Sequence, residues 1–525
     1  MGFHWLLVSP VPLLFFVKRS SSMTFKTDQE HILPYLTDAS NAPGGEAEVV
    51  FFPHNEDGIL QAIAYCRSQG LRMTVSGAGT GLAGGRVPLG GAVIATERMN
   101  RVVAINPETY SAIVEPGVIL GEFQREVEQK HRLYPPDPTE RSCFVGGTVS
   151  TNSSGARTFK YGPTRNFVDR LRMITAQGER LDVRRGDTYA QGNRLSLVAE
   201  SGRVYDVTLP SYTMPDLKHA AGYFVRPGMD AIDLFIGSEG TLGIVTEIHT
   251  RLIHLPSGLF SGIVFFPDES STLAFVDEAR SRSKSRDTSG AETHIDARAL
   301  EFMDRHSLDL IRPRYPDIPV AAMGGAVWFE QETTEETESD VMMAWHDLVI
   351  RSGGLVDSSW FAVTEERQQR MRQFRHAIPE TVYEYLTEHG QIKLGTDMAV
   401  PDSRLHELIA YYRSELKQLG IRAVTYGHIG NSHLHVNMLC RGDEEYQRAR
   451  CVYDGMVDTA LSLGGTISAE HGVGKIKKSY LMRMYGAHAI SEMRRLKRIF
   501  DPEGLLGVGT MFDLDEKSHA ANFFG

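Results

Sequence analysis

The chain has 525 residues, of which 42% are hydrophobic and 23% charged, so it is long enough for two or three globular domains. Its formal net charge of −11 argues against nucleic acid as the main partner, and an anionic substrate would need a local cluster of positive groups. The four cysteines are far apart and form no C-x-x-C pair, which argues against a disulfide framework or an iron–sulfur cluster and favours a reducing, cytoplasmic compartment.

The first twenty residues contain an apolar stretch at 3–17. It is too short to span a membrane, is interrupted by Pro10 and Pro12, and lacks the basic start of a signal peptide. The sequence from Met23 onward reads as an ordinary amphipathic start. We therefore expect translation to begin at Met23, with a peripheral membrane contact by the apolar stretch as the alternative.

The first predicted elements alternate between helices and strands. Asn55 or Asp57 can cap a helix whose apolar residues recur at helical spacing, and Gly70 is suited to end it. In chain order we expect a helix and loop over 23–50, a strand at 49–53, this helix, and a buried strand at 71–76.

A glycine-rich run follows at 76–91, SGAGTGLAGGRVPLGG. It contains Gly79-x-Gly81-x-x-Gly84, the spacing of a Rossmann fingerprint. In that motif a helix must follow, and here Gly85 and Pro88 prevent one. The run instead predicts a loop whose backbone N–H groups line a concavity for phosphate.

Two further runs repeat this chemistry. The segment PPDP at 135–138 makes a rigid kink, and the run at 146–168 is rich in glycine, hydroxyl side chains and basic residues. A third run, GSEGTLGIVTEI at 237–248, leads into a strand. Three such loops beside strands predict one extended cofactor threaded between sheets.

Glycine becomes sparser after Pro256. Strands are predicted at 261–267, 320–330 and 391–401, and helices at 270–283, 335–351 and 370–386, the last interrupted by Pro379. Strand–helix units of this size predict an α+β lid over the cofactor.

The stretch 425–439, TYGHIGNSHLHVNML, reads as strand, turn and strand. Alternation places His433, His435 and Asn437 on one face, and His428 can face the same side across the turn. Glu470 follows about thirty residues later. Two histidines and a carboxylate with open positions are the composition of a catalytic rather than a structural divalent-metal site; the alternative is two strand histidines in a polar cleft plus a surface Glu-His pair.

The glycine-rich runs and PPDP, in this order, resemble the vanillyl-alcohol oxidase/para-cresol methylhydroxylase (PCMH) superfamily. The nearest branch holds the glycolate oxidase D-subunit and the D-lactate and D-2-hydroxyglutarate dehydrogenases, and the resemblance covers about 45–512. It implies an α+β fold: a PCMH-type FAD-binding domain of two subdomains, a cap with an antiparallel sheet, and a C-terminal helical segment. The implied divisions are an N-terminal extension and helix (1–44), the FAD-binding domain (45–255), the cap or substrate domain (256–424), and a C-terminal segment that completes the cap and closes on FAD (425–525).

The resemblance also implies non-covalent FAD. One departure is Ala78, where the family often has glycine; its methyl group restricts the loop without removing backbone donors. The implied cofactor-binding residues are Ser76, Gly77, Ala78, Gly79, Thr80, Gly81, Leu82, Pro136, Asp137, Gly146, Gly147, Thr148, Thr151, Asn152, Gly155, Gly240, Ile244 and Val245.

The run GHIGNSHLH at 427–435 resembles the family's G-H-x-G-D-G-N-L-H metal motif, with His433 in place of the family's asparagine. The resemblance implies a zinc or manganese ion on His428, His435 and Glu470, and His471 as catalytic base. It further implies substrate contacts from Arg375, Lys393, Asn437 and His433.

The expected reaction is oxidation of a D-2-hydroxy acid (D-lactate, D-2-hydroxyglutarate or a glycolate-like acid) to the 2-oxo acid. The base takes the hydroxyl proton and flavin N5 takes the hydride. We expect an external electron acceptor: a quinone, a cytochrome or an electron-transfer flavoprotein. A homodimer is the oligomeric state that we consider. The alternatives are a non-redox enzyme of the alkylglycerone-phosphate synthase type and a flavin electron-transfer subunit.

Overall fold

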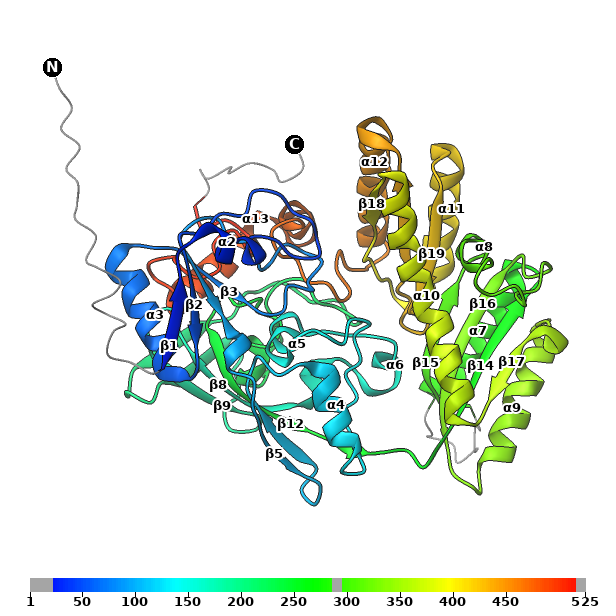
Figure 1. Ribbon diagram of the computed structural model, residues 1–525, viewed down its shortest axis with the longest axis horizontal. Coiled ribbons are helices and arrows are strands. Elements are labelled where there is room, and N and C mark those ends of the chain that lie inside the picture. The colour runs from blue at the N-terminus through cyan, green and yellow to red at the C-terminus, as the bar shows by residue number, and fades with distance from the viewer. Residues whose placement is uncertain (1–21, 286–294, 516–525) are drawn as a thin grey trace.

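The computed structural model describes residues 22–285 and 295–515, which form two lobes lying side by side (Figure 1). The N-terminal lobe comprises residues 22–255 together with 478–515, and the cap lobe comprises residues 256–462. The apolar stretch at 3–17 lies outside the described residues. Of the helices that the structure describes, none is long and apolar enough to cross a membrane.

The first sheet of the N-terminal lobe has four strands in the order β1-β2-β4-β3. Strands β2, β4 and β3 are parallel, and helix α3 (Glu56–Gln69) connects β2 to β3. The side chain of Asn55 caps α3 by accepting the Gly58 N–H, and Gly70 ends the helix with φ +64°, as predicted. The strands are β1 (Met23–Lys26), β2 (Val49–Pro53), β3 (Met73–Ser76) and β4 (Ala92–Ala95).

The helix expected within 23–50 is wrong apart from a single turn. Residues Met23–Lys26 form β1, which pairs antiparallel with β2, and only α2 (Gln29–Ile32) and the 3-10 turn Leu33–Tyr35 follow. Pairing with a sheet edge satisfies the backbone groups of this segment, so a tertiary contact outweighs local helical preference.

The second sheet of this lobe has five antiparallel strands in the order β5-β6-β12-β8-β9. The glycine-rich run at 146–168 does not form one open loop: it includes the short helices α5 and α6. The strands are β5 (Val102–Asn106), β6 (Ser111–Val114), β8 (Val168–Ile174), β9 (Arg180–Arg184) and β12 (Ile244–Arg251). The helices are α4 (Leu120–Glu128), α5 (Val145–Thr151) and α6 (Thr158–Tyr161). Two small ribbons pair β7 (Arg132–Leu133) with β13 (Ile253–His254) and β10 (Arg194–Val198) with β11 (Val204–Thr208).

The cap lobe is built on a seven-stranded antiparallel sheet in the order β17-β14-β16-β15-β19-β20-β18. This sheet confirms the predicted fold class, α+β with an antiparallel cap. The strands are β14 (Gly258–Phe266), β15 (Ala297–Met303), β16 (Gly325–Thr333), β17 (Trp360–Ala362), β18 (Ile392–Gly395), β19 (Ala423–Gly427) and β20 (His435–Cys440).

Helices cover both faces of the cap sheet. Helices α7 and α9 pack on one face, where Trp345 stacks on Phe329 with ring centroids 3.7 Å apart. Helices α8 and α10 pack on the other, and α10 continues through Pro379. The helices are α7 (Glu269–Lys284), α8 (Arg305–Ile311), α9 (Glu338–Arg351), α10 (Glu365–His389), α11 (Leu405–Leu419) and α12 (Gly442–Ser462).

The chain returns to the N-terminal lobe after α12. Helix α13 (Lys478–Phe500) lies on that lobe, where Phe500 stacks on Tyr205 at 5.1 Å. The following residues pair beside β3, since Met73 N–H donates to Leu505 O at 2.7 Å. The segment 463–477 therefore crosses from the cap lobe to the N-terminal lobe and carries Glu470 and His471 between them.

Candidate active site

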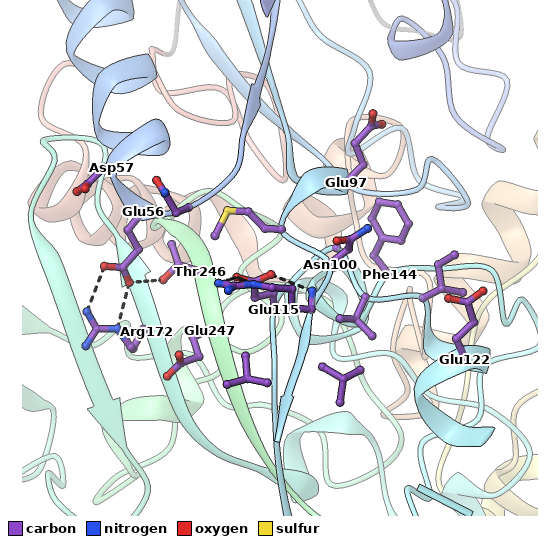
Figure 2. A pocket seen from close by; sticks show the side chains of 18 of the residues that line it. Glu56, Asp57, Glu97, Asn100, Glu115, Glu122, Phe144, Arg172, Thr246 and Glu247 are labelled. Carbon is purple, nitrogen blue, oxygen red and sulfur yellow. Dashed lines mark hydrogen bonds and ion pairs between the residues drawn. The ribbon is translucent and has the colours of Figure 1, made fainter. Parts of the chain in front are cut away.

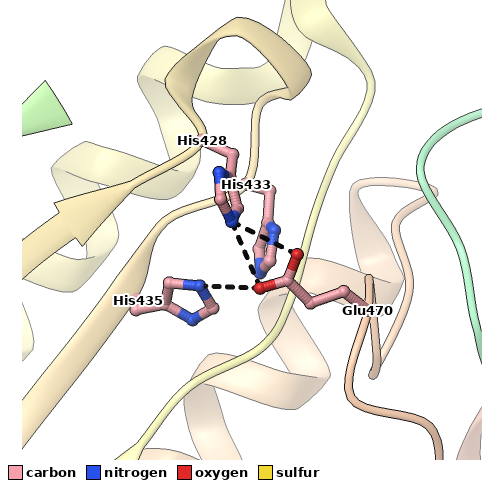
Figure 3. A group of neighbouring side chains, drawn as sticks. All are labelled: His428, His433, His435 and Glu470. Carbon is pink, nitrogen blue, oxygen red and sulfur yellow. Dashed lines mark hydrogen bonds and ion pairs between the residues drawn. The ribbon is translucent and has the colours of Figure 1, made fainter. Parts of the chain in front are cut away.

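Three predicted metal ligands meet where β19 ends and β20 begins (Figure 3). His428 follows the last residue of β19, and His435 is the first residue of β20. Glu470 Oε1 lies 3.2 Å from His428 Nε2 and 3.2 Å from His435 Nε2. A two-strand ladder sets the two rings, and the crossing segment brings the carboxylate to them.

The far nitrogens of both rings are occupied. His428 Nδ1 lies 2.6 Å from Glu301 Oε1, and His435 Nδ1 lies 3.0 Å from Thr396 O. Because a carboxylate and a carbonyl can only accept, each ring donates from Nδ1 and turns Nε2 toward Glu470, where it carries a lone pair when the ring is neutral. Two imidazole nitrogens and a carboxylate oxygen thus converge on one point, which is the donor set of a divalent cation.

Lys218 holds the outer oxygen of Glu470 and was missed by the sequence reasoning. Its Nζ lies 2.5 Å from Glu470 Oε2 and 3.2 Å from His433 Nδ1, and the side chain is buried. Burial opposes the charged form of Glu470, but His428 and Lys218 outweigh it and hold its pKa well below the usual range. Lys218 belongs to an irregular segment of the N-terminal lobe, and no local pattern marks it.

His433 lies beside His435, with ring centroids 4.4 Å apart, and belongs to the same group of possible ligands as His428 and Glu470 (Figure 3). It precedes β20, bridges to Ala399, and is fully buried. Its Nε2 lies 3.1 Å from Asp397 Oδ1, and its Nδ1 faces Lys218. The turn over Ile429–Asn431 and the left-handed Ser432 (φ +53°) connect β19 to the segment that carries His433.

His471 lies beside the metal ligands. Its ring stacks on His435 at 5.3 Å, and its Nε2 lies 3.6 Å from Glu470 Oε1. Its Nδ1 lies 3.4 Å from Asp397 Oδ2, which leaves Nε2 as the free basic nitrogen. Burial lowers the pKa of His471 to about 4, although Asp397 opposes the shift, so the ring is neutral at pH 7.

Asp397 organises the crossing segment and was also missed. The buried carboxylate accepts the backbone N–H of Glu470 at 3.3 Å and of His471 at 3.1 Å, and pairs with Lys477 Nζ at 2.6 Å. A weak signal exists in the sequence, because an acidic residue in the apolar stretch 396–400 requires buried partners.

Lys393 and Asn437 lie on one face of paired strands. Gly395 of β18 is opposite Asn437 of β20, and Lys393 is two residues along the same face. A Cβ at Gly395 would lie 2.9 Å from Asn437 Oδ1, so only glycine lets that amide lie across β18. Lys393 pairs with none of the described residues; it is accessible to solvent, yet surrounding protein atoms desolvate it and lower its pKa.

Arg375 lies on α10 and is buried against the same cluster. Its Nη2 and Nε donate to Glu301 Oε2 at 2.8 and 3.1 Å, and its Nη1 donates to Thr139 Oγ1 at 2.9 Å. Thr139 directly follows the PPDP segment. The predicted substrate arginine is therefore already held by the acid that holds His428, at the boundary between the lobes.

The glycine-rich runs gather around the loop that carries His471. Glu239, in the third run, accepts the N–H groups of Val473 and Gly474 at 2.8 and 2.7 Å. Lys475 Nζ donates to Gly85 O of the first run at 3.0 Å. The cofactor loops and the predicted base thus share one boundary, which the spacing of motifs along the chain does not reveal.

The predicted cofactor residues occupy four neighbouring places. A Cβ at Gly155 would lie 1.8 Å from Asp137 O, so this glycine lets the second run contact the PPDP segment. Gly81 and Gly147 have no protein atom within 4 Å of where a Cβ would stand. The predicted residues lie at the end of β3 and after it (Ser76, Gly77, Ala78, Gly79, Thr80, Gly81, Leu82), in the kink (Pro136, Asp137), on and after α5 (Gly146, Gly147, Thr148, Thr151, Asn152, Gly155), and before and within β12 (Gly240, Ile244, Val245).

A cavity of about 1010 Å³ opens between the two sheets of the N-terminal lobe (Figure 2). Phe144, just before α5, and Thr246 of β12 line it. Several acids also line it, but two of them are paired with arginines. Arg172 Nε donates to Glu56 Oε1 at 3.0 Å, and Arg101 Nη2 donates to Glu115 Oε1 at 2.7 Å. The cavity is roomy enough for a large part of a dinucleotide.

Known families match both lobes. Residues 47–184 match the model described as FAD binding domain, and residues 269–511 match that of FAD linked oxidases, C-terminal domain. The glycolate oxidase subunit GlcD of Bacillus subtilis (strain 168) is 30% identical over 498 residues, covering 92% of this chain and 93% of the relative.

Two other relatives carry different substrate names. A D-lactate dehydrogenase of Anaerostipes hadrus is 27% identical, with 88% of this chain and 89% of the relative covered. A D-2-hydroxyglutarate dehydrogenase of Stutzerimonas stutzeri (strain A1501) is 26% identical, with 93% and 95% covered.

The fold is shared with p-cresol methylhydroxylase. That solved structure with substrate bound has a TM-score of 0.68 at 15% identity, covering 93% of this chain and 94% of the other. The predicted FAD-binding architecture and enzyme class are confirmed. The chain belongs to the FAD-linked oxidases, in the family of 2-hydroxy-acid oxidases and dehydrogenases.

Proposed function

We propose that the protein oxidises a D-2-hydroxy acid to the 2-oxo acid with non-covalent FAD and a divalent ion, zinc or manganese, held by His428, His435 and Glu470. One observation carries the proposal: the Nε2 atoms of two imidazoles and a carboxylate oxygen converge beside the neutral ring of His471. Nitrogen and carboxylate ligands with open positions suit such an ion.

The chain's open backbone supports the placement of FAD. Gly81 and Gly147 present backbone without neighbouring atoms, which suits close approach of a pyrophosphate. The cavity lined by Phe144 and Thr246 suits the adenine end, because its acids repel phosphate but accept N–H groups.

Different residues would bind the cofactor, bind the ion and accept the proton in this reaction. When bound, FAD would supply the hydride acceptor for C2, and a divalent ion on His428, His435 and Glu470 would supply a Lewis acid for the hydroxyl. His471 takes the hydroxyl proton on Nε2, while Asp397 holds the opposite nitrogen. The hydroxyl proton and the C2 hydride are the two hydrogens that leave the substrate, which becomes the 2-oxo acid.

Positive groups hold the acid in place. Arg375 and Lys393 supply charge for the substrate carboxylate, and Asn437 supplies an amide on the same face as Lys393. His433 touches Lys218 rather than open space, so we expect it to affect substrate choice through Lys218 and Glu470. An external acceptor, a quinone, cytochrome or electron-transfer flavoprotein, then reoxidises the flavin.

Anaerobic flavin bleaching tests the proposal. The purified FAD-loaded protein is mixed with D-lactate, D-2-hydroxyglutarate and longer D-2-hydroxy acids, with their L-enantiomers as matched controls, and with the achiral glycolate. We expect at least one D-acid to bleach the flavin absorbance and its L-enantiomer to do so far more slowly. If none of the acids bleaches the flavin, the dehydrogenase assignment fails, and a non-redox or electron-transfer role takes its place.

A further inference from the structure

Glu301 lies on the middle strand of the cap sheet, and its two carboxylate oxygens serve different partners. Oε1 accepts from His428 Nδ1 at 2.6 Å, and Oε2 accepts from Arg375 Nη2 at 2.8 Å. The side chain is buried to 1% exposure, so this charge is tolerated only because both partners neutralise it. One acid thus joins a proposed metal ligand to the proposed substrate arginine.

Each contact fixes the orientation of one group: His428 in the proposed ion site and Arg375 in the proposed substrate site. The contact with Oε1 sets the ring rotation of His428 and keeps the proton on Nδ1, so that Nε2 faces Glu470. The contact with Oε2 uses the side of Arg375 formed by Nε and Nη2, and Nη1 is left at the boundary with Thr139. Neither group can turn without breaking a bond to the same carboxylate.

Glu330 provides a matched comparison within the same sheet. It lies on the neighbouring strand β16, is fully buried, and pairs with Arg298 Nη2 at 2.7 Å and Arg372 Nη1 at 3.1 Å. It therefore shares with Glu301 the burial, the charge and pairing with arginine, here with two arginines instead of one. It has no histidine contact among the described residues, so it separates loss of a buried carboxylate from loss of the contact with His428.

We infer that Glu301 is a positioning residue that couples the divalent-ion site to the substrate-carboxylate site, an inference that rests on the proposed function. Removing its charge weakens the hold on His428 and releases Arg375 in one step. The ion affinity and the KM for the hydroxy acid then change together, whereas a merely structural carboxylate changes neither selectively.

The primary measurement is ion affinity rather than activity. The dissociation constant for Mn²⁺ is measured by chelator competition on FAD-loaded wild type, Glu301→Gln and Glu330→Gln. We expect Glu301→Gln to bind the ion roughly 10- to 100-fold more weakly, the usual cost of losing such an outer partner, and Glu330→Gln to stay within about twofold. In Co²⁺-loaded protein, the visible absorption bands shift for Glu301→Gln alone.

A double variant guards against misfolding. Glu301→Gln leaves the Arg375 charge buried without its partner, so Glu301→Gln with Arg375→Gln removes both charges and the same loss of ion affinity is expected. Wild-type affinity in a folded Glu301→Gln or in the double variant would overturn the inference alone. If wild-type protein binds no stoichiometric ion, the proposed metal site and the inference fall together.

Discussion

Replacement of His471 by alanine removes a neutral imidazole that lies beside the predicted metal ligands. Its Nε2 lies 3.6 Å from Glu470 Oε1, whereas the nitrogens of His433 face Lys218 and Asp397. The ring of His471 stacks on His435, but the hydrogen bonds that hold the three predicted ligands come from Glu301, Thr396 and Lys218. The change therefore removes proton transfer and leaves cofactor and ion binding in place.

The expected loss follows from the chemistry of a general base. A positioned base contributes roughly 10²- to 10⁴-fold, which is about 3 to 5 kcal/mol at 1.36 kcal/mol per tenfold. Arg375, Lys393 and Asn437 remain, so substrate binding should weaken by less than about tenfold. The loss therefore belongs in the rate of flavin reduction rather than in affinity.

Anaerobic stopped-flow measurement of flavin reduction separates the two effects. The limiting rate at saturating substrate reports the chemical step, and its concentration dependence reports binding. His219→Ala is a suitable control, because His219 is also a buried neutral imidazole but contacts Thr466 and Tyr485 instead of Glu470. A limiting rate for His471→Ala within about fivefold of wild type would refute its role as base.

Two further predictions concern the loops and the cap sheet. Gly155→Ala should destabilise the N-terminal lobe, because its Cβ would lie 1.8 Å from Asp137 O. Gly147→Ala should instead lower FAD occupancy without changing the melting temperature of the apoprotein. Calorimetry measures the melting temperatures and the flavin-to-protein absorbance ratio measures the occupancy; the same change in both variants would contradict the different roles given to the two glycines. Burial alone would raise the pKa of Glu330, but Arg298 outweighs it and lowers the pKa to about 2, below the ordinary 4.5. The stability from this ionised acid is complete above pH 4.5 and is lost as the pH falls toward 2, so denaturant titrations should show the difference between wild type and Glu330→Gln shrinking over that interval; a constant difference would contradict it.

Local patterns predicted many elements because their causes are local. The capping side chain of Asn55 and the left-handed Gly70 bound α3 in the structure as in the sequence. The stretch 423–440 forms two paired strands around a turn, since β19 and β20 adjoin in the chain. The helix predicted within 23–50 was wrong because residues Met23–Lys26 form a strand only by pairing with β2, and local preferences do not encode that pairing.

In the candidate site, too, residues in local motifs were predicted from the sequence and residues with distant partners were not. Motifs identified His428, His435, Glu470 and His471, and the FAD-binding family followed from the glycine-rich runs. Glu301, Asp397 and Lys218 were not predicted, because each contacts a partner far away in the sequence. Glu301 and His428 are 127 residues apart, and Lys218 and Glu470 are 252 residues apart. A charged residue's type is visible in a sequence, but its partner is not.

The sequence by itself determined the family, the α+β class, and which residue types can hold a cofactor and a divalent ion, because those properties reside in short runs of glycine, histidine and acid. Only the tertiary structure decided that segment 463–477 crosses between the lobes, that Lys218 of one lobe holds Glu470 of the crossing segment, and that one acid holds both His428 and Arg375. These arrangements are long-range: burying a charge requires an opposite charge at close distance, and packing of whole sheets chooses which one is there.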